Sequence, residues 1–251
     1  MKIAFSGKGG VGKTTLAALI IRLLAAQDQK LLAIDADSNP SLAETLGFPD
    51  PDKIIPLIQM KDLIKDRIGS DQGGLYTLTP KVDDIMERFI HVHQGLKLIS
   101  MGAIERGGGG CACPQNSFLK SVLGQIFSQA DETIIIDMEA GLEQLGRGTA
   151  QDVDHLLIVV DQGSGSIRTA RRIYQLADEL KIKNKSVIAN RIRQDSDIDF
   201  IKKSLKTGSV IGSIPYSEEI LEADRKSDST VFDQQILLAP MRKIAEKLTL
   251  I

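Results

Sequence analysis

The residues with the clearest chemical meaning lie in a glycine-rich segment near the start of the sequence. Residues 7–14 fit the pattern G-x-x-x-x-G-K-[ST], between a short apolar run and a helix-like apolar run. A strand, such a loop and a helix together form a cradle whose backbone N–H groups bind phosphate. There Lys13 binds the β- and γ-phosphates and the Thr14 hydroxyl binds Mg²⁺. The pattern predicts nucleotide binding by Gly9, Gly10, Val11, Gly12, Lys13, Thr14 and Thr15.

Carboxylates follow two of the apolar runs that are expected to be buried strands. Asp35 and Asp37 end one run, and Asp137 ends another. Ligands of an open α/β sheet bind beyond the carboxyl ends of its strands, so these side chains are expected beside the phosphate loop. Asp137 is the candidate for ordering hydrated Mg²⁺, with a strand-end cap as its alternative. Of Asp35 and Asp37, one is expected to help order Mg²⁺ and the other to align the attacking water.

Three later positions complete the predicted nucleotide site. Gly141 supplies the flexibility expected of a loop that senses the γ-phosphate. Asn190 and Arg191, at the end of a late strand, are candidates for reading the base, and Pro215 is expected nearby.

The two cysteines, Cys111 and Cys113, follow a run of glycines at 107–110. Two thiolates at i and i+2 can face one metal ion, whereas a soft tetrahedral site requires four ligands. A twofold dimer would supply two such pairs, which suit tetrahedral Zn²⁺ or square-planar Ni²⁺. Two alternatives stay open: a pair of small buried hydrophobic residues, or a redox pair, for which the short spacing is strained.

The elements that must position these residues are predicted from short apolar runs that alternate with amphipathic segments. This alternation is typical of an α/β protein with a mostly parallel sheet of about seven to eight strands and helices on both faces. Strands are expected at 2–6, 30–35, 96–101, 132–137, 155–160, 185–190 and 210–214. Helices are expected at 14–26, 116–129, 167–180, 197–205 and 235–248. One domain, 1–251, is predicted, with an insertion at 48–95 that contains short helices at 57–67 and 83–89.

Composition and charge argue against several functional classes. The net charge of −2 implies no polyanionic partner, and 4% aromatic residues without tryptophan argue against a stacking surface for single-stranded nucleic acid. Neither a signal peptide nor an apolar run of the ~20 residues that cross a bilayer is found. We therefore expect a cytoplasmic protein with no nucleic acid and no membrane as partner.

The motifs together resemble one family of nucleotide-binding proteins. The segments 8–15, 35–37 and 137–141 are similar to those of the deviant phosphate-loop (Walker A) ATPases, which include MinD, ParA and the nitrogenase iron protein. The resemblance extends from the first strand to the segment at 214–216, and it implies a homodimeric P-loop ATPase that uses ATP, ADP and Mg²⁺. It also implies that Lys8 reaches the nucleotide of the other subunit, that Asp37 positions water, and that Asn190 lies near adenine.

The cysteine segment points to a narrower group within that family. A Cys-x-Cys pair after a glycine run looks like that of the CooC-type ATPases, which serve nickel insertion into carbon monoxide dehydrogenase, and of related acetyl-CoA synthase accessory proteins. This resemblance implies a metallochaperone that binds Ni²⁺ or Zn²⁺ through Cys111 and Cys113 and has a nickel enzyme as its partner. One alternative is a positioning or partition switch with incidental cysteines. Another is an electron-transfer protein, although the cluster cysteines of the nitrogenase iron protein lie far apart in sequence.

Overall fold

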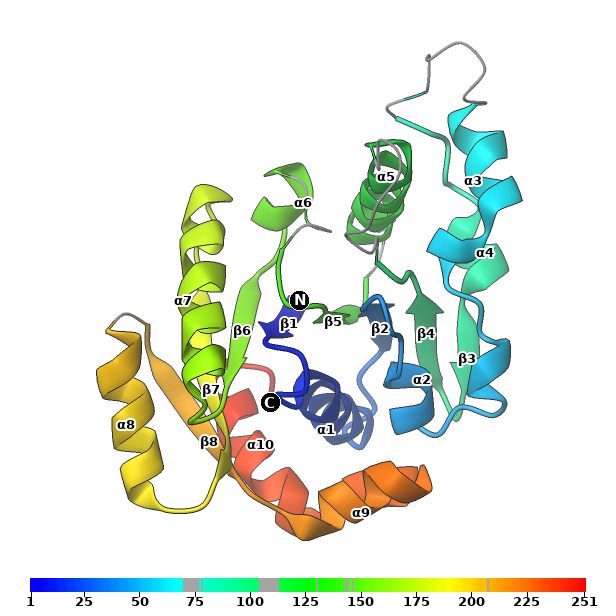
Figure 1. The fold of residues 1–251 in the computed structure, drawn as a ribbon. Coiled ribbons are helices and arrows are strands. Elements are labelled where there is room, and N and C mark those ends of the chain that lie inside the picture. The colour runs from blue at the N-terminus through cyan, green and yellow to red at the C-terminus, as the bar shows by residue number, and fades with distance from the viewer. Residues whose placement is uncertain are drawn as a thin grey trace.

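The strands of the protein form one sheet of eight strands in the order β3-β4-β2-β5-β1-β6-β7-β8 (Figure 1). This computed structural model describes residues 1–69, 77, 79–103, 113–129, 131–142, 145, 147–206 and 208–251. The strands are β1 (Lys2–Gly7), β2 (Leu31–Ala36), β3 (His91–His93), β4 (Leu96–Ser100), β5 (Thr133–Met138), β6 (His155–Val160), β7 (Lys185–Ile192) and β8 (Val210–Pro215). Neighbouring strands are parallel except for β3, which pairs antiparallel with β4. The predicted α/β class and mostly parallel sheet are thus confirmed.

The sheet separates two layers of helices, each with its own apolar core (Figure 1). One core contains side chains of α1 (Lys13–Ala25), α2 (Leu42–Thr45), α9 (Glu218–Lys226) and α10 (Gln235–Lys247). The other contains side chains of α3 (Lys61–Ile68), α4 (Ile85–Phe89), α5 (Cys113–Gln129), α6 (Arg147–Gln151), α7 (Ser164–Glu179) and α8 (Asp195–Leu205). Because both faces are covered, the central strands are almost continuously buried, which explains their unbroken apolar sequences.

The seven predicted strands are all present, with ends within two residues of the expected ones. The edge strand β3 was not predicted, because three residues are too short a run for a periodic signal. The predicted helix at 57–67 is instead a 3-10 turn, Leu57–Gln59, followed by α3, with Met60 between them. The predicted helix at 116–129 begins earlier, at Cys113. The helices α2, α6 and α9 were not predicted.

The topology brings the polar ends of the central strands to one edge of the sheet. Strands β1, β2 and β5 run parallel as neighbours, and Asp35 on β2 pairs in register with Asp137 on β5. Among the helices that the structure describes, none combines the length and the hydropathy of a membrane-spanning segment.

Candidate nucleotide-binding site

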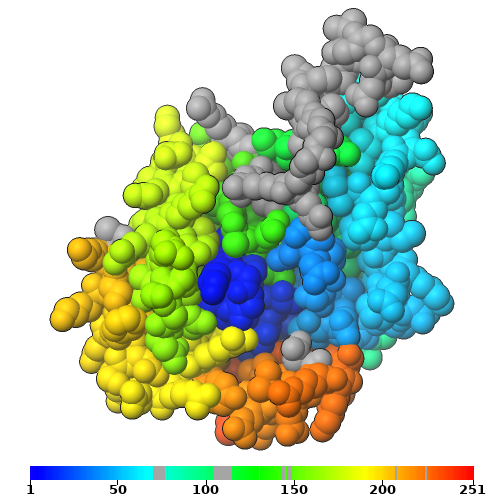
Figure 2. Space-filling view, viewed as in Figure 1, coloured from blue at the N-terminus to red at the C-terminus, as the bar shows by residue number. Residues whose placement is uncertain are grey.

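The phosphate loop lies at the centre of the face shown in Figure 2, where its dark-blue residues stand between α7 and the segment after β2. It joins the end of β1 at Gly7 to the start of α1 at Lys13, which is the predicted order of strand, loop and helix. Two of its glycines allow close approaches. A Cβ on Gly7 would lie 2.5 Å from the backbone oxygen of Val159. Gly12 has a left-handed φ of +96°, and a Cβ there would collide with the side chain of Asn190.

The remaining residues of the phosphate loop differ in how far they are exposed to solvent. Gly9 and Gly10 are exposed, Val11 is buried, and Thr15 is half-buried on the first turn of α1. The N-terminus of this helix faces the loop and contributes the positive end of its dipole. The loop therefore has exposed backbone where phosphate would bind, and an apolar anchor that fixes it to the core.

Lys13 forms an ion pair with Asp37 at the base of the loop. The distance from Lys13 Nζ to Asp37 Oδ2 is 3.6 Å, and the side chains are only 6% and 19% exposed. Water screens such a pair little, so the carboxylate holds the lysine in place without a nucleotide. The structure thus brings together the lysine predicted to bind phosphate and the carboxylate predicted to position water.

Thr14 and Asp137 form the next contact. The Thr14 Oγ1 hydroxyl donates to Asp137 Oδ2 at 2.5 Å, while Asp137 Oδ1 is buried and has no hydrogen-bond partner within the described part of the chain. Burial raises the pKa of Asp137 to about 8, and the nearby charge of Asp35 adds to the rise. A buried carboxylate oxygen without a donor, next to a hydroxyl ligand, fits a hydrated Mg²⁺ ion.

Asp35 shapes the segment that presents Asp37. Its Oδ2 accepts the N–H of Leu42 at 2.8 Å, and its Oδ1 accepts the N–H of Asp37 at 3.3 Å. Burial raises its pKa to about 6, although these backbone donors oppose the rise. Its backbone oxygen accepts the N–H of Met101 at 2.8 Å, which ties this segment to the exit of β4. The predicted contribution of Asp35 to ordering Mg²⁺ stays a prediction.

Ser6 joins the phosphate loop to the segment after β5, a contact that sequence reasoning missed. Its Oγ lies 3.1 Å from the carbonyl oxygens of both Glu139 and Gly141. The Gly141 N–H donates to the Glu139 oxygen at 2.7 Å, so these residues form a tight turn. A polar residue at the buried end of an apolar strand was the available signal.

The three residues predicted near the base occupy different positions. Asn190 is buried, and its Nδ2 donates to the Val11 carbonyl at 2.8 Å, so it supports the phosphate loop. Arg191 is exposed, with a left-handed φ of +57°. Pro215 is exposed at the end of the edge strand β8. The role of these three in reading the base stays a prediction.

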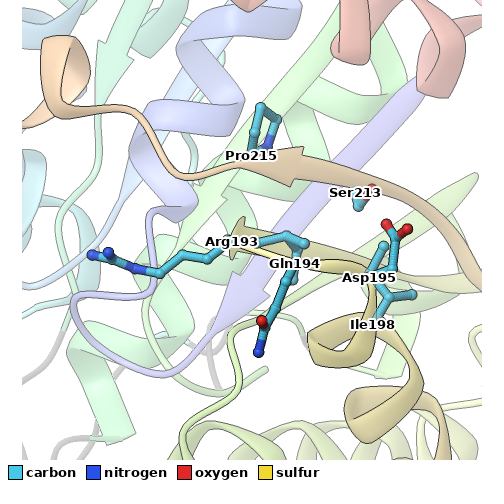
Figure 3. A pocket seen from close by; sticks show the side chains of 7 residues that line it. Arg193, Gln194, Asp195, Ile198, Ser213 and Pro215 are labelled. Atoms are coloured by element: carbon cyan, nitrogen blue, oxygen red, sulfur yellow. The ribbon is translucent and has the colours of Figure 1, made fainter.

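A hollow of about 260 Å³ lies where β7 and β8 end and α8 begins (Figure 3). Pro215 lines it, whereas Asn190 and Arg191 do not. Arg193 also lines it and extends away from Asp195 and Ile198, and its guanidinium carbon lies 3.9 Å from the centre of the Tyr216 ring. The full lining consists of Ile192, Arg193, Gln194, Asp195, Ile198, Ser213 and Pro215.

Lys8 is exposed and lies against the start of α7. Its Nζ is 3.4 Å from the position that a Cβ on Gly165 would take. The side chain therefore rests on its own subunit in this structure. Its predicted reach to a second subunit stays a prediction.

The predicted metal pair lies largely outside the described residues. Cys111 is not among them, and Cys113 is described only as the first residue of α5. Within the described ranges, no group of three or more His, Cys, Asp or Glu side chains is arranged to hold a metal ion.

Comparison with known proteins adds a family and close relatives. Residues 2–231 match the family described as the CobQ/CobB/MinD/ParA nucleotide binding domain. The chain is 40% identical over 229 residues to the carbon monoxide dehydrogenase accessory protein CooC of Rhodospirillum rubrum, covering 90% of this chain and 87% of that protein. It is also 40% identical over 230 residues to an uncharacterized ATP-binding protein of Methanocaldococcus jannaschii, with 89% and 88% coverage.

Solved structures show the same fold. The MinC:MinD cell division complex of Aquifex aeolicus is similar with a TM-score of 0.70 and 25% identity, covering 98% of this chain and 94% of that one. MinD of Pyrococcus horikoshii complexed with Mg-ADP has a TM-score of 0.69 and 19% identity, with the same coverage.

Proposed function

Because this chain belongs to the CobQ/CobB/MinD/ParA family of nucleotide-binding proteins, we propose that it is a homodimeric ATPase that assists nickel insertion into carbon monoxide dehydrogenase or an acetyl-CoA synthase type of enzyme. The ATPase activity and the membership of the deviant phosphate-loop class follow from the family. The observation that supports the proposed role in nickel insertion is the similarity to CooC over most of both chains. The Cys-x-Cys pair supplies the corresponding metal chemistry.

The site residues suit hydrolysis of the bond between the β- and γ-phosphates of ATP. The loop N–H groups and Lys13 would bind the phosphates, and Thr14 and Asp137 would hold a hydrated Mg²⁺ ion. When bound, Mg²⁺ neutralises charge on the phosphate oxygens. Asp37 would orient the water whose oxygen bonds to the γ-phosphorus as ADP leaves. Positioning and charge neutralisation supply most of the catalysis in such reactions.

The ion pair between Lys13 and Asp37 couples nucleotide binding to this step. Phosphate oxygens would compete for the Lys13 ammonium, since its distance to Asp37 is already as long as 3.6 Å. Release of the lysine would free the Asp37 carboxylate to accept a hydrogen bond from the attacking water. The resting contact thus keeps the water-positioning group occupied until ATP arrives.

The metal ion is the cargo in this proposal, and the cysteines of two subunits would bind it. Thiolate sulfur is a ligand that Ni²⁺ and Zn²⁺ both accept. The helix α5 begins at Cys113, so one of the two proposed ligand residues is the first residue of a helix. Metal binding to a shared site would also stabilise the dimer.

The test combines the measured mass of the protein in solution with its metal content. The wild-type chain is expected to dimerise with Ni²⁺ or Zn²⁺ and to hold one ion per dimer. The variant C111A/C113A should lose that ion. H91A/H93A is the matched control, because it removes two other metal-binding side chains at the same spacing. Equal metal content in the cysteine variant and the wild type would overturn the metal role and favour a positioning or partition switch.

A further inference from the structure

We propose that an exposed surface shared by α7 and α8 docks an acidic surface of the enzyme that receives the metal ion. We call this surface the α7–α8 face, and it consists of Arg168, Arg171, Arg172, Phe200 and Lys203. The inference rests on the proposed function and deepens it, because it names the surface through which the chain would recognise its protein partner.

Three arginines lie together on the outer side of α7. Arg168 precedes Arg171 by three positions and Arg172 by four, and residues at these spacings are neighbours on a helix surface. All three are exposed, and none forms an ion pair within the described part of the chain. Stabilisation of the helix dipole does not explain them, because cations are favoured in the last turn, where α7 has none.

The tertiary structure places the end of α8 beside these arginines (Figure 1). The Arg171 Nη2 donates to the backbone oxygen of Ser204, near the end of α8. Phe200 precedes Ser204 by four positions and Lys203 by three, so these residues are neighbours on α8 and continue the surface of the arginines. Lys202, in contrast, lies about 200° around the helix from Ser204 and faces away from α7.

The like charges of the α7–α8 face repel one another in the protein alone. Asp199 is exposed one turn before Lys203, but it forms no ion pair with it in the structure. The net charge of the whole chain is −2, so the positive charge here is local. Acidic groups of a partner would relieve the repulsion, and the positive surface would steer such a partner toward it.

The composition of the α7–α8 face favours a protein over a nucleic acid. Phe200 is 48% exposed, and an exposed aromatic side chain among arginines is typical of the centre of a protein interface. Asp195 and Asp199 are exposed on α8 and would repel the phosphate backbone of a nucleic acid. We therefore expect the occupant to be a protein surface with Asp and Glu side chains around an apolar contact for Phe200.

The test measures binding of the full chain to nickel-free carbon monoxide dehydrogenase by biolayer interferometry at rising NaCl concentration. R168E/R172E should weaken the affinity roughly thirtyfold or more at low salt, because an acidic partner would then meet like charge. The wild-type affinity should also fall more steeply with salt than that of the variant. K181E/K183E is the matched control: it changes the net charge equally at exposed lysines beyond the C-terminal end of α7 and should bind like wild type.

Variants of α8 test its share of the surface. K203E should weaken binding roughly fivefold, whereas K202E should leave the affinity unchanged, because the two lysines face different sides of the helix. F200A should weaken binding without altering the salt dependence, since salt does not screen an apolar contact. Arg171 is kept in all variants, because its bond to Ser204 also joins the two helices. If R168E/R172E does not fold, K203E against K202E carries the comparison.

The outcomes separate this inference from the proposed function. Wild-type affinity in R168E/R172E, or equal losses in K181E/K183E, would show that the α7–α8 face is not the docking surface. Loss of the dimer in R168E/R172E would assign the face to contact between two copies of this chain. Duplex DNA that binds wild type but not this variant would identify a nucleic acid as the occupant. If the wild-type chain does not bind the enzyme at all, the proposed function fails in its partner.

Discussion

Asp35 and Asp137 lie side by side on β2 and β5, on the face of the sheet toward α1. Their burial raises both pKa values, to about 6 and about 8. Two carboxyl groups so close together cannot both be charged at low cost without a cation. Without nucleotide, the pair of carboxyl groups therefore holds a proton. In the proposed working site, a cation would take over its role of reducing the repulsion between them.

This arrangement predicts that the stability of the nucleotide-free protein falls as pH rises. The folded chain keeps a proton on Asp137 up to about pH 8, whereas the unfolded chain releases it near the ordinary value of 3.8. Folding takes up this proton between those values, so the free energy of unfolding decreases with pH across that window. D137N should flatten the dependence and melt several degrees higher than wild type near pH 8.

Melting temperatures measured with EDTA from pH 5 to pH 9 check this prediction. D84N is the control, because Arg88 and Arg67 lower the pKa of Asp84 to about 2 and its titration lies outside the window. A flat wild-type profile would contradict the assignment.

Asn190 is predicted to stabilise the protein before any nucleotide binds. N190A removes the donor to the buried Val11 carbonyl and should lower the free energy of unfolding by about 1–3 kcal/mol. Urea denaturation without nucleotide measures the change, with the exposed R191A as control. If Asn190 acted only on the base, N190A would unfold like wild type and lose only nucleotide affinity.

Asp37 is predicted to affect the reaction more than binding. D37N keeps the shape of the side chain but removes the charge that orients water, so we expect kcat to fall roughly a hundredfold or more. ATP affinity should change little or improve, because Lys13 loses a competing partner. Steady-state hydrolysis and AMPPNP titration separate these effects, and a raised KM with unchanged kcat would argue for a role in binding alone.

At the scale of elements, the contact between β1 and β6 sets the start of the phosphate loop. Gly7 pairs with Val159, and a Cβ on Gly7 would meet the backbone oxygen of Val159 at 2.5 Å. Gly9 is only two residues later, yet a Cβ there would meet nothing within 4 Å in the part of the chain that the structure describes. A close approach of two strands therefore requires glycine at position 7, whereas no such contact requires it at position 9.

G7A is predicted to destabilise the sheet, whereas G9A is not. Separating two central strands should lower the free energy of unfolding by at least about 2 kcal/mol, as overpacking does in other cores. G9A should stay within about 0.5 kcal/mol of wild type. Urea denaturation of the two variants side by side tests this, and equal losses would show that the strand contact is not the cause.

At the scale of the whole molecule, the proposed dimer makes a prediction about mixtures of inactive subunits. If Lys8 acts on the nucleotide of the other subunit, K8A and D37N should each be nearly inactive alone. Mixed dimers would contain one site with both Asp37 and a Lys8 from the other side. A random mixture should then recover about a quarter of the wild-type rate, since half of the dimers have one working site.

Hydrolysis by equimolar mixtures, against each variant alone, measures this recovery. A mixture of K8A with K13A is a second test with the same expectation. Activity equal to the average of the two separate variants would show that Lys8 acts on the nucleotide of its own subunit. That result would agree with the contact between Lys8 and Gly165 within one subunit.

The sequence by itself determined the α/β class, the strand positions and the phosphate loop. Each of these features is specified by residues close together in the sequence, as the phosphate loop is by the residues from Gly7 to Thr14. The family follows from the same local motifs, and the comparisons confirmed it. Short elements such as β3 escaped prediction, because packing at the sheet edge decides them more than their own periodicity.

Only the tertiary structure decided what several of these residues contact. Asn190 reaches Val11 across 179 residues of sequence, and Ser6 reaches Glu139 across 133. Asp35 has a predictable place at a strand end, but its backbone partners depend on how the following segment turns. The physical reason is that a parallel sheet brings the ends of distant strands to one edge. Local sequence specifies each strand end and does not specify which ends become neighbours.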